Sequence, residues 1–180
     1  MSDRFEYIDR FEDIIRRNLG CAVIFTGSDS DREHIGKLVS SLSEFEVPVE
    51  VRIVSAHKQL KKLENIMLGY DAIPGALAYI VVAGGTDAMS GTVSYNTYRP
   101  TISCPPDGLN ENCLRNPPGS SNAFILRPEN VGRFVAQMFS HVNPRYRELI
   151  EEKNRKKNAN LEDADERLRR ELSWYGEEGQ

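Results

Sequence analysis

The chain has 180 residues, of which 39% are hydrophobic and 28% charged, a composition typical of one soluble domain with a real core and room for an appendage. Its formal net charge of −4 provides no overall basic field, so binding to a nucleic-acid backbone or to an anionic membrane surface is not expected. The first apolar run comes only at residues 21–25. We therefore expect neither a secretory signal nor a membrane-spanning segment, and we expect a cytoplasmic protein.

The first twenty residues have the apolar spacing of an amphipathic helix. We assign residues 1–20 to an N-terminal helix that packs on the core or on a partner subunit. The residues that share its apolar face are Phe5, Ile8, Phe11, Ile14, Ile15 and Leu19.

Five short apolar runs rich in branched residues follow, and we expect each to be a strand. They cover residues 21–26, 49–54, 77–82, 101–104 and 123–126. Helical spacing occurs between them at residues 35–42 and 60–67, and more weakly at residues 88–98. Strands that alternate with helices predict a parallel sheet covered on both faces, because each crossover must return over the sheet. We therefore expect an α/β domain over residues 21–143.

Two segments differ in composition from this unit. Residues 105–121 are rich in Pro, Gly and Asn, and we expect them to form an exposed loop. Residues 144–180 are dominated by Glu, Arg, Lys and Asn with sparse apolar positions, which predicts a charged extension made of one helix or a pair of helices with a solvated face.

The three cysteines do not form a metal-binding pattern. Cys21, Cys104 and Cys113 make no CxxC pair and have no histidine at ligand spacing. We expect reduced, mostly buried thiols and no metal site.

The first strand ends in Gly-Ser-Asp-Ser-Asp at residues 27–31, just before a helix. Small residues at such a turn leave backbone N–H groups open, and the helix dipole favours a phosphate there. Ser28 could then face a phosphate and Asp31 could hold ribose hydroxyls. The turn lacks the fingerprints of dinucleotide and nucleoside-triphosphate sites. An ordinary turn capped by Ser30 or Asp31 also explains it.

The second strand ends in Ser55-Ala56-His57-Lys58. An imidazole with a reference pKa of about 6.5 exchanges protons at neutral pH, and a neighbouring lysine supplies a cation for a phosphate. A structural or merely exposed histidine is the alternative, and it is the interpretation we give to His34 and His141.

The third strand ends in Ala83-Gly84-Gly85-Thr86-Asp87, where two glycines permit close approach of a ligand or simply a tight turn. Parallel neighbouring strands place all three ends along one edge of the sheet. A phosphate site, a titratable imidazole and an open backbone would then share one crevice.

These motifs, in this order over residues 21–142, resemble the family of aminoimidazole ribonucleotide (AIR) carboxylases and N5-carboxyaminoimidazole ribonucleotide (N5-CAIR) mutases, the PurE-like enzymes. The resemblance implies a flavodoxin-like α/β/α sandwich and a homo-octamer with sites at subunit boundaries. It also implies a nucleotide substrate, AIR or its 4-carboxylated product CAIR, with CO2 as the carboxyl source and without metal or organic cofactor.

The family has a branch that carboxylates AIR directly and a branch that rearranges N5-CAIR. Lys58, the segments 102–106 and 114–119, and the Ala-Met-Ser-Gly run at residues 88–91, which includes Ser90 and Gly91, are similar to the direct carboxylase branch. Gly85 is similar to the mutase branch, and residues 85–87 replace the Arg-Ser-Asn of the carboxylases. We expect that Asp87, if it points inward, disfavours an anionic product.

By this resemblance, His57 is the proton carrier at C4 of the imidazole. The substrate-binding residues that the resemblance implies are Ser28, Asp31, Ser55, Ala56, Lys58, Ala83, Gly84, Gly85, Ser90 and Gly91. The implied reaction is carboxylation of AIR in purine biosynthesis. The alternatives are an N5-CAIR mutase, a nucleotide-binding relative without catalysis, and a flavodoxin-like electron carrier, because fold alone does not fix function.

Overall fold

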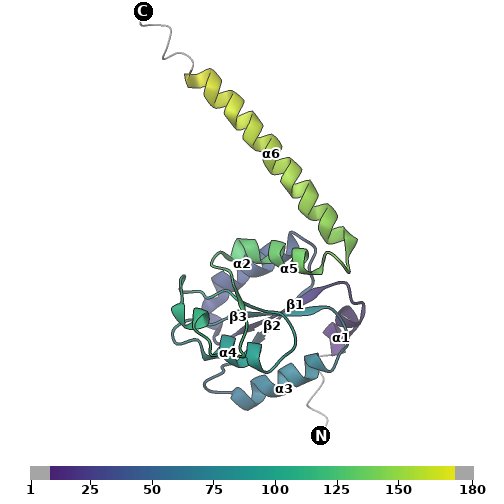
Figure 1. Cartoon of the computed structure of the whole chain (residues 1–180), viewed down its shortest axis with the longest axis vertical. Coiled ribbons are helices and arrows are strands. Elements are labelled where there is room, and N and C mark those ends of the chain that lie inside the picture. Colours follow the sequence, from purple (N-terminus) through teal and green to yellow (C-terminus); the bar gives the residue numbers. More distant parts are fainter. Residues whose placement is uncertain (1–8, 173–180) are drawn as a thin grey trace, which may run out of the picture.

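The computed structural model describes residues 9–172, and they form a five-stranded parallel sheet with the strand order β2-β1-β3-β4-β5. The strands are β1 (Cys21–Thr26), β2 (Val49–Ile53), β3 (Leu77–Val82), β4 (Thr101–Ser103) and β5 (Ala123–Phe124). Helices cover both faces of the sheet, so the predicted flavodoxin-like three-layer fold is confirmed (Figure 1). β5 is shorter than expected.

The helices divide between the two faces. The first face carries α2 (Arg32–Ser43), α5 (Val131–Phe139) and the start of α6 (Pro144–Leu172), and the second carries α1 (Asp9–Arg16), α3 (Leu60–Asp71) and α4 (Ala88–Tyr95). The described part of the chain also contains short 3-10 helices at Asp29–Asp31, Glu111–Leu114 and Pro128–Asn130. Among the described residues, no helix combines the length and apolarity that a bilayer-spanning segment needs.

The central strands β1 and β3 are buried along their whole length. They pair in register from Cys21 opposite Leu77 to Thr26 opposite Val82. Alternate side chains enter opposite layers: Val23 and Phe25 join the core under α3, whereas Ala22 and Ile24 join the core under α2 and α5. Burial on both faces explains why these strands read as continuous apolar runs rather than as alternating ones.

Helix α5 was absent from our sequence-based expectations. It packs against α2, and Gly132 is the residue at the contact with the α2 backbone. A Cβ on Gly132 would fall 2.0 Å from the backbone oxygen of Ser41. The Ser41 hydroxyl accepts a hydrogen bond from the Gly132 backbone N–H at 2.8 Å. Contact between the two helices at this distance requires a glycine.

The N-terminal helix is shorter than the predicted residues 1–20. Phe11 and Ile15 of α1 enter the core beside α3, so packing on the core, one of the two expected options, applies to them. Leu19 was expected on the same apolar face, but α1 ends at Arg16 and Leu19 is 47% exposed in the following turn. Phe5 and Ile8 lie outside the described residues.

The C-terminal extension forms one helix, α6, over its described part, rather than a pair. Its first turns pack on the body: Tyr146 and Leu149 are buried, and the Tyr146 hydroxyl donates a hydrogen bond to the Gly20 carbonyl at 2.6 Å. The remainder extends away from the body (Figure 1).

Candidate active site

The carboxyl ends of β1, β2 and β3 surround a cavity of about 190 Å³. It lies where the chain reverses direction across the sheet, since β2 and β3 flank β1, and open α/β sheets bind ligands at such a point. The cavity is lined by Gly27, Ser28, Asp31, Ser55, Ala56, His57, Val82, Ala83, Gly84, Asp87, Ala88 and Met89.

At the first strand end, Ser28 is a helix cap. Its Oγ accepts a hydrogen bond from the Ser30 backbone N–H at 3.1 Å, at the start of the short 3-10 helix. The Ser30 hydroxyl lies 2.9 Å from the same oxygen. Ser28 therefore caps the 3-10 helix, whereas Asp31, one of the two residues that the alternative interpretation offered, occupies the N-cap position of α2. The Asp31 side chain does not cap the described helix α2, and it lines the cavity.

At the second strand end, Ser55 shapes the turn that presents His57. The Ser55 hydroxyl accepts a hydrogen bond from the Lys58 backbone N–H at 3.3 Å. His57 is exposed to solvent, and its Nε2 lies 3.4 Å from the Thr86 hydroxyl of the third strand end. The imidazole therefore lies at the opening of the cavity between two strand ends. Lys58 is exposed and lies outside the cavity lining.

At the third strand end, the backbone of Gly85 is already engaged. Gly85 adopts φ +63°, a conformation that favours glycine, and its N–H donates to the Asp107 carboxylate at 2.8 Å. Its carbonyl accepts from the side-chain amides of Asn110 at 3.0 Å and Asn112 at 2.8 Å. From the sequence we expect this backbone to be open to a ligand, but the Asp107 carboxylate of the chain itself occupies the Gly85 N–H.

The loop that carries these partners is largely exposed, as expected for residues 105–121, but some of its side chains are buried. Asn110 and Cys113 are buried, and Cys113 donates from its thiol to the Asn110 carbonyl at 3.0 Å. His34 of α2 tethers the start of the loop, since its Nε2 lies 2.9 Å from the Cys104 carbonyl oxygen. This histidine thus has a structural contact, as we expected for it.

Asp87 caps helix α4. Its Oδ1 accepts a hydrogen bond from the Ser90 backbone N–H at 3.0 Å, and its backbone is left-handed with φ +32°. Burial raises the pKa of this carboxyl, hydrogen bonds from Ser90 and Met89 lower it, and the nearby Asp107 raises it further, with a net upward shift. Asp87 also lines the cavity, so a partly desolvated carboxyl group lies close to any ligand.

Ser90 and Gly91 lie outside the cavity lining, as does Gly85. The Ser90 hydroxyl accepts a hydrogen bond from the Asn116 amide at 3.2 Å, and a Cβ on Gly91 would meet the Asn116 side-chain oxygen at 2.8 Å. Both residues instead pack α4 against the loop. Asp107 is a neighbour of the cavity that sequence reasoning did not single out, and Thr86, noted there only as a departure from the carboxylase branch, lies beside His57.

The three cysteines of the chain are buried free thiols, as expected. Burial raises the pKa of Cys104 to about 12 and that of Cys113 to about 11. A thiol with a raised pKa is a poor nucleophile at neutral pH, and none of the three thiols lines the cavity, where the ionisable side chains are Asp31, His57 and Asp87.

The sequence of this site belongs to a known family. Residues 21–160 match the family model described as AIR carboxylase. The chain is 35% identical over 124 residues to the phosphoribosylaminoimidazole carboxylase of Treponema denticola, covering 66% of this chain and 78% of the relative. It is 31% identical over 136 residues to the N5-carboxyaminoimidazole ribonucleotide mutase of Mycobacterium tuberculosis, covering 71% of this chain and 78% of the relative.

A longer relative and a solved structure extend these matches. The chain spans 34% of the length of a bifunctional phosphoribosylaminoimidazole carboxylase/succinocarboxamide synthetase of Rattus norvegicus, at 34% identity over 143 residues. The crystal structure of Treponema denticola PurE superposes with a TM-score of 0.77 at 28% identity, covering 82% of this chain and 98% of that one. The strand ends, the cavity and these matches together place the chain in the AIR carboxylase (PurE) family of enzymes.

Proposed function

We propose that this enzyme carboxylates AIR with CO2 to give CAIR in purine biosynthesis. The observation that carries the proposal is the position of His57, whose imidazole lies at the opening of a cavity formed by three strand ends. A cavity of about 190 Å³ is small enough to hold part of a nucleotide and to exclude much of the bulk water.

The chemistry needs a proton acceptor and little else. The aminoimidazole ring is an enamine-like nucleophile at C4, so a bond forms between C4 and the carbon of CO2 while one C=O electron pair moves to oxygen as the carboxylate. The resulting tetrahedral C4 must lose its proton to restore aromaticity, and His57 takes it. Proton transfer of this kind contributes roughly 100- to 10,000-fold in rate. Because the ring supplies its own nucleophile, the step requires neither a metal nor an organic cofactor.

We assign the remaining residues to substrate binding. Asp31, which faces the cavity and is not used as a cap, would accept hydrogen bonds from ribose hydroxyls. Ser28, Ser55 and Lys58 would hold the phosphate at the cavity opening, with Lys58 as its cation. Ala56, Ala83 and Gly84 would contact the ring and the carboxylate through backbone and small side chains.

The assignments of Gly85, Ser90 and Gly91 rest on the family resemblance alone. These three residues lie outside the cavity lining and would act by holding α4 and the loop in place.

We also propose that the enzyme is a homo-octamer. Support comes from apolar side chains that remain exposed in the single subunit, on the edge strand β2 and at the end of α4. Val51 and Ile53 are exposed on β2, and Tyr95 and Tyr98 are exposed near the α4 end. Such surfaces are costly in water and mark subunit contacts in symmetric assemblies.

Rearrangement of N5-CAIR to CAIR, the mutase reaction, is the second candidate function. It is favoured by Gly85 and by the similarity to the mycobacterial mutase. A direct assay separates the two reactions: purified enzyme receives AIR and bicarbonate without ATP, and CAIR formation is followed by absorbance. We expect the rate to rise with dissolved CO2 and the reverse decarboxylation to be measurable. Efficient turnover of N5-CAIR without any AIR carboxylation would overturn the proposal in favour of the mutase. Binding of AIR without either reaction would indicate a catalytically inactive relative.

A further inference from the structure

The outer half of α6 carries an apolar stripe that the subunit does not cover. Leu161, Leu168 and Leu172 are 61%, 54% and 55% exposed, and Ala164 lies on the same side of the helix. With about 3.6 residues per turn, these positions fall on one narrow face, the spacing of a helix–helix contact. The family match ends at residue 160, so the stripe is a feature added to the family's shared fold.

The stripe continues the face by which α6 packs on its own subunit. Tyr146 and Leu149 near the helix start are buried. The Lys153 Nζ lies 2.9 Å from the Glu44 carboxylate. Asn154 accepts a hydrogen bond from Arg133 at 2.9 Å. Beyond this point the helix projects from the body (Figure 1). A helix of 29 residues is about 44 Å long, so its apolar face extends well past the surface that buries its first turns.

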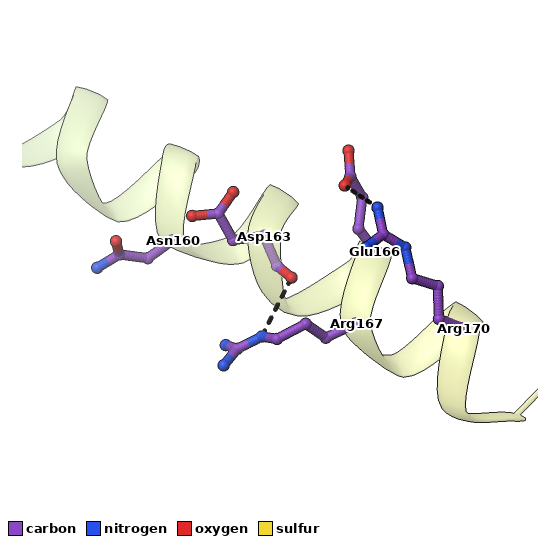
Figure 2. Close-up of a pocket in the computed structure, with 5 residues that line it drawn as sticks. All are labelled: Asn160, Asp163, Glu166, Arg167 and Arg170. Atoms are coloured by element: carbon purple, nitrogen blue, oxygen red, sulfur yellow. Dashed lines mark hydrogen bonds and ion pairs between the residues drawn. The ribbon is translucent and has the colours of Figure 1, made fainter.

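The opposite side of the same segment is polar. Figure 2 shows Asn160, Asp163, Glu166, Arg167 and Arg170 along it. The Arg167 Nε donates to the Asp163 carbonyl at 3.3 Å, and Glu166 pairs with Arg170 at 3.3 Å. These contacts run along the helix and stabilise it as a helix. The segment is therefore amphipathic, with a solvated face and a narrow apolar face, rather than polar on all sides.

Charge along this segment is separated into two blocks. Residues 162–166 hold four carboxylates and no basic residue, and residues 167–170 hold three arginines and no acidic residue. Two such helices side by side in parallel would place like charges together. In antiparallel orientation Asp165, which flanks the stripe, lies beside Arg169 on the same flank of the other helix, which is the arrangement of a two-fold symmetric contact.

We propose that α6 pairs with α6 of a second copy of this chain, antiparallel, about a two-fold axis between residues 166 and 167. This register places Leu161 opposite Leu172 of the partner subunit, and Ala164 beside Leu168 of the partner subunit, so that a small side chain meets a large one. The contact buries the stripe and places Asp165 beside Arg169 of the partner subunit. It links two subunits, or two assemblies, through a surface separate from the active site.

Disulfide trapping in the full-length protein tests both the pairing and its direction. A disulfide requires Cα atoms within about 7 Å. In the proposed register, Leu161→Cys and Leu172→Cys in one chain form two cross-links to a second chain, whereas either substitution alone places its own copies about 16 Å apart along the axis. The two new cysteines of one helix are separated by the same distance, so they cannot join within a chain. The native thiols are buried, so the unsubstituted protein serves as the background.

We expect the double variant to give a disulfide-linked dimer on a non-reducing gel at a yield at least about tenfold above either single variant. Cross-linking by each single variant as well as by the double variant would show a parallel or nonspecific contact and would overturn the proposal. Absence of cross-linking in all three would also overturn it and would leave the stripe to a different partner. Adding Arg169→Glu to the double variant should abolish the cross-link, because an acidic side chain then faces Asp165 of the partner subunit.

Discussion

The Asp107 carboxylate accepts a hydrogen bond from the backbone N–H of Gly85 at 2.8 Å, although the two residues are 22 positions apart in the sequence. An internal carboxylate thus occupies a backbone donor that our sequence analysis expected to be open to a ligand. A negative charge at this position raises the free energy of a second carboxylate nearby.

Removing the charge of Asp107 should therefore change the relative binding affinities of the enzyme for the product CAIR and the substrate AIR. Asp107→Asn keeps an oxygen acceptor for Gly85 but removes the negative charge, so we expect CAIR to bind about fivefold more tightly, corresponding to roughly 1 kcal/mol, while AIR binding is unchanged. Calorimetric titration of both nucleotides measures the two affinities. Asp163→Asn on the projecting part of α6 removes the same charge far from the cavity and should change neither. An equal gain in affinity for AIR and CAIR would mean that Asp107 affects entry of both nucleotides into the cavity, and that it does not act on the carboxylate of CAIR.

The proton-carrier role of His57 predicts a specific kinetic loss. His57→Asn keeps a polar side chain but cannot exchange protons near neutral pH, so kcat should fall at least about 100-fold. Substrate affinity, measured by titration with AIR, should stay close to that of the unsubstituted enzyme. His141→Asn changes an exposed histidine at the end of α5 and serves as the control. Near-normal turnover by His57→Asn would contradict the mechanism.

Asp31 should show the opposite kinetic pattern. Its carboxylate faces the cavity, and removal of a ribose contact present in both ground and transition states raises KM with a smaller change in kcat. Asp29→Ala is the matched control because Asp29 is exposed in the same short helix and lies outside the cavity lining. If Asp31→Ala lowered kcat and left KM unchanged, the assignment of Asp31 to substrate binding would be wrong.

The raised pKa of Asp87 predicts how stability depends on pH. The folded state holds a proton on this carboxyl more tightly than the unfolded chain does. The stabilising effect is thus complete below the unfolded pKa and is lost as pH rises through the raised folded pKa. Asp87→Asn keeps a capping oxygen and tolerates the left-handed backbone, but it has no such titration.

The free energy of unfolding of Asp87→Asn, relative to the unsubstituted protein, should therefore increase as pH rises above about 4, the unfolded pKa of an aspartate. Urea titrations at several pH values measure this difference. A constant difference across that range would show that burial of the ionised carboxylate costs no stability.

The contact between α2 and α5 predicts opposite effects at two helical glycines. Gly132→Ala places a methyl group against the Ser41 backbone, and we expect a loss of roughly 1–3 kcal/mol in unfolding free energy. Gly36→Ala in α2 meets no atom within 4 Å and should gain about 0.5–1 kcal/mol from helix propensity. Thermal unfolding of the two variants checks both signs. Stabilisation by both would mean that the two helices separate easily at this contact.

Local patterns in the sequence were sufficient for the main elements of the fold. β1 and β3 are continuous apolar runs because both of their faces are buried, and the helices between the strands follow the apolar spacing. The family and the three strand ends were also predictable, because their motifs are contiguous in the chain. Helix α5 has comparable spacing, with Val131, Val135 and Phe139 buried, and this signal was available but unused.

Contacts between distant segments were decided only by the tertiary structure. The cap provided by Ser28, the engagement of Gly85 by Asp107 and the position of Lys58 outside the cavity lining depend on where loops and strand ends meet. Loop geometry is set by a few hydrogen bonds between residues far apart in the chain, which leave no periodic signal. The sequence by itself therefore determined which strand ends carry polar residues, and the folded chain decided which of those residues face the cavity.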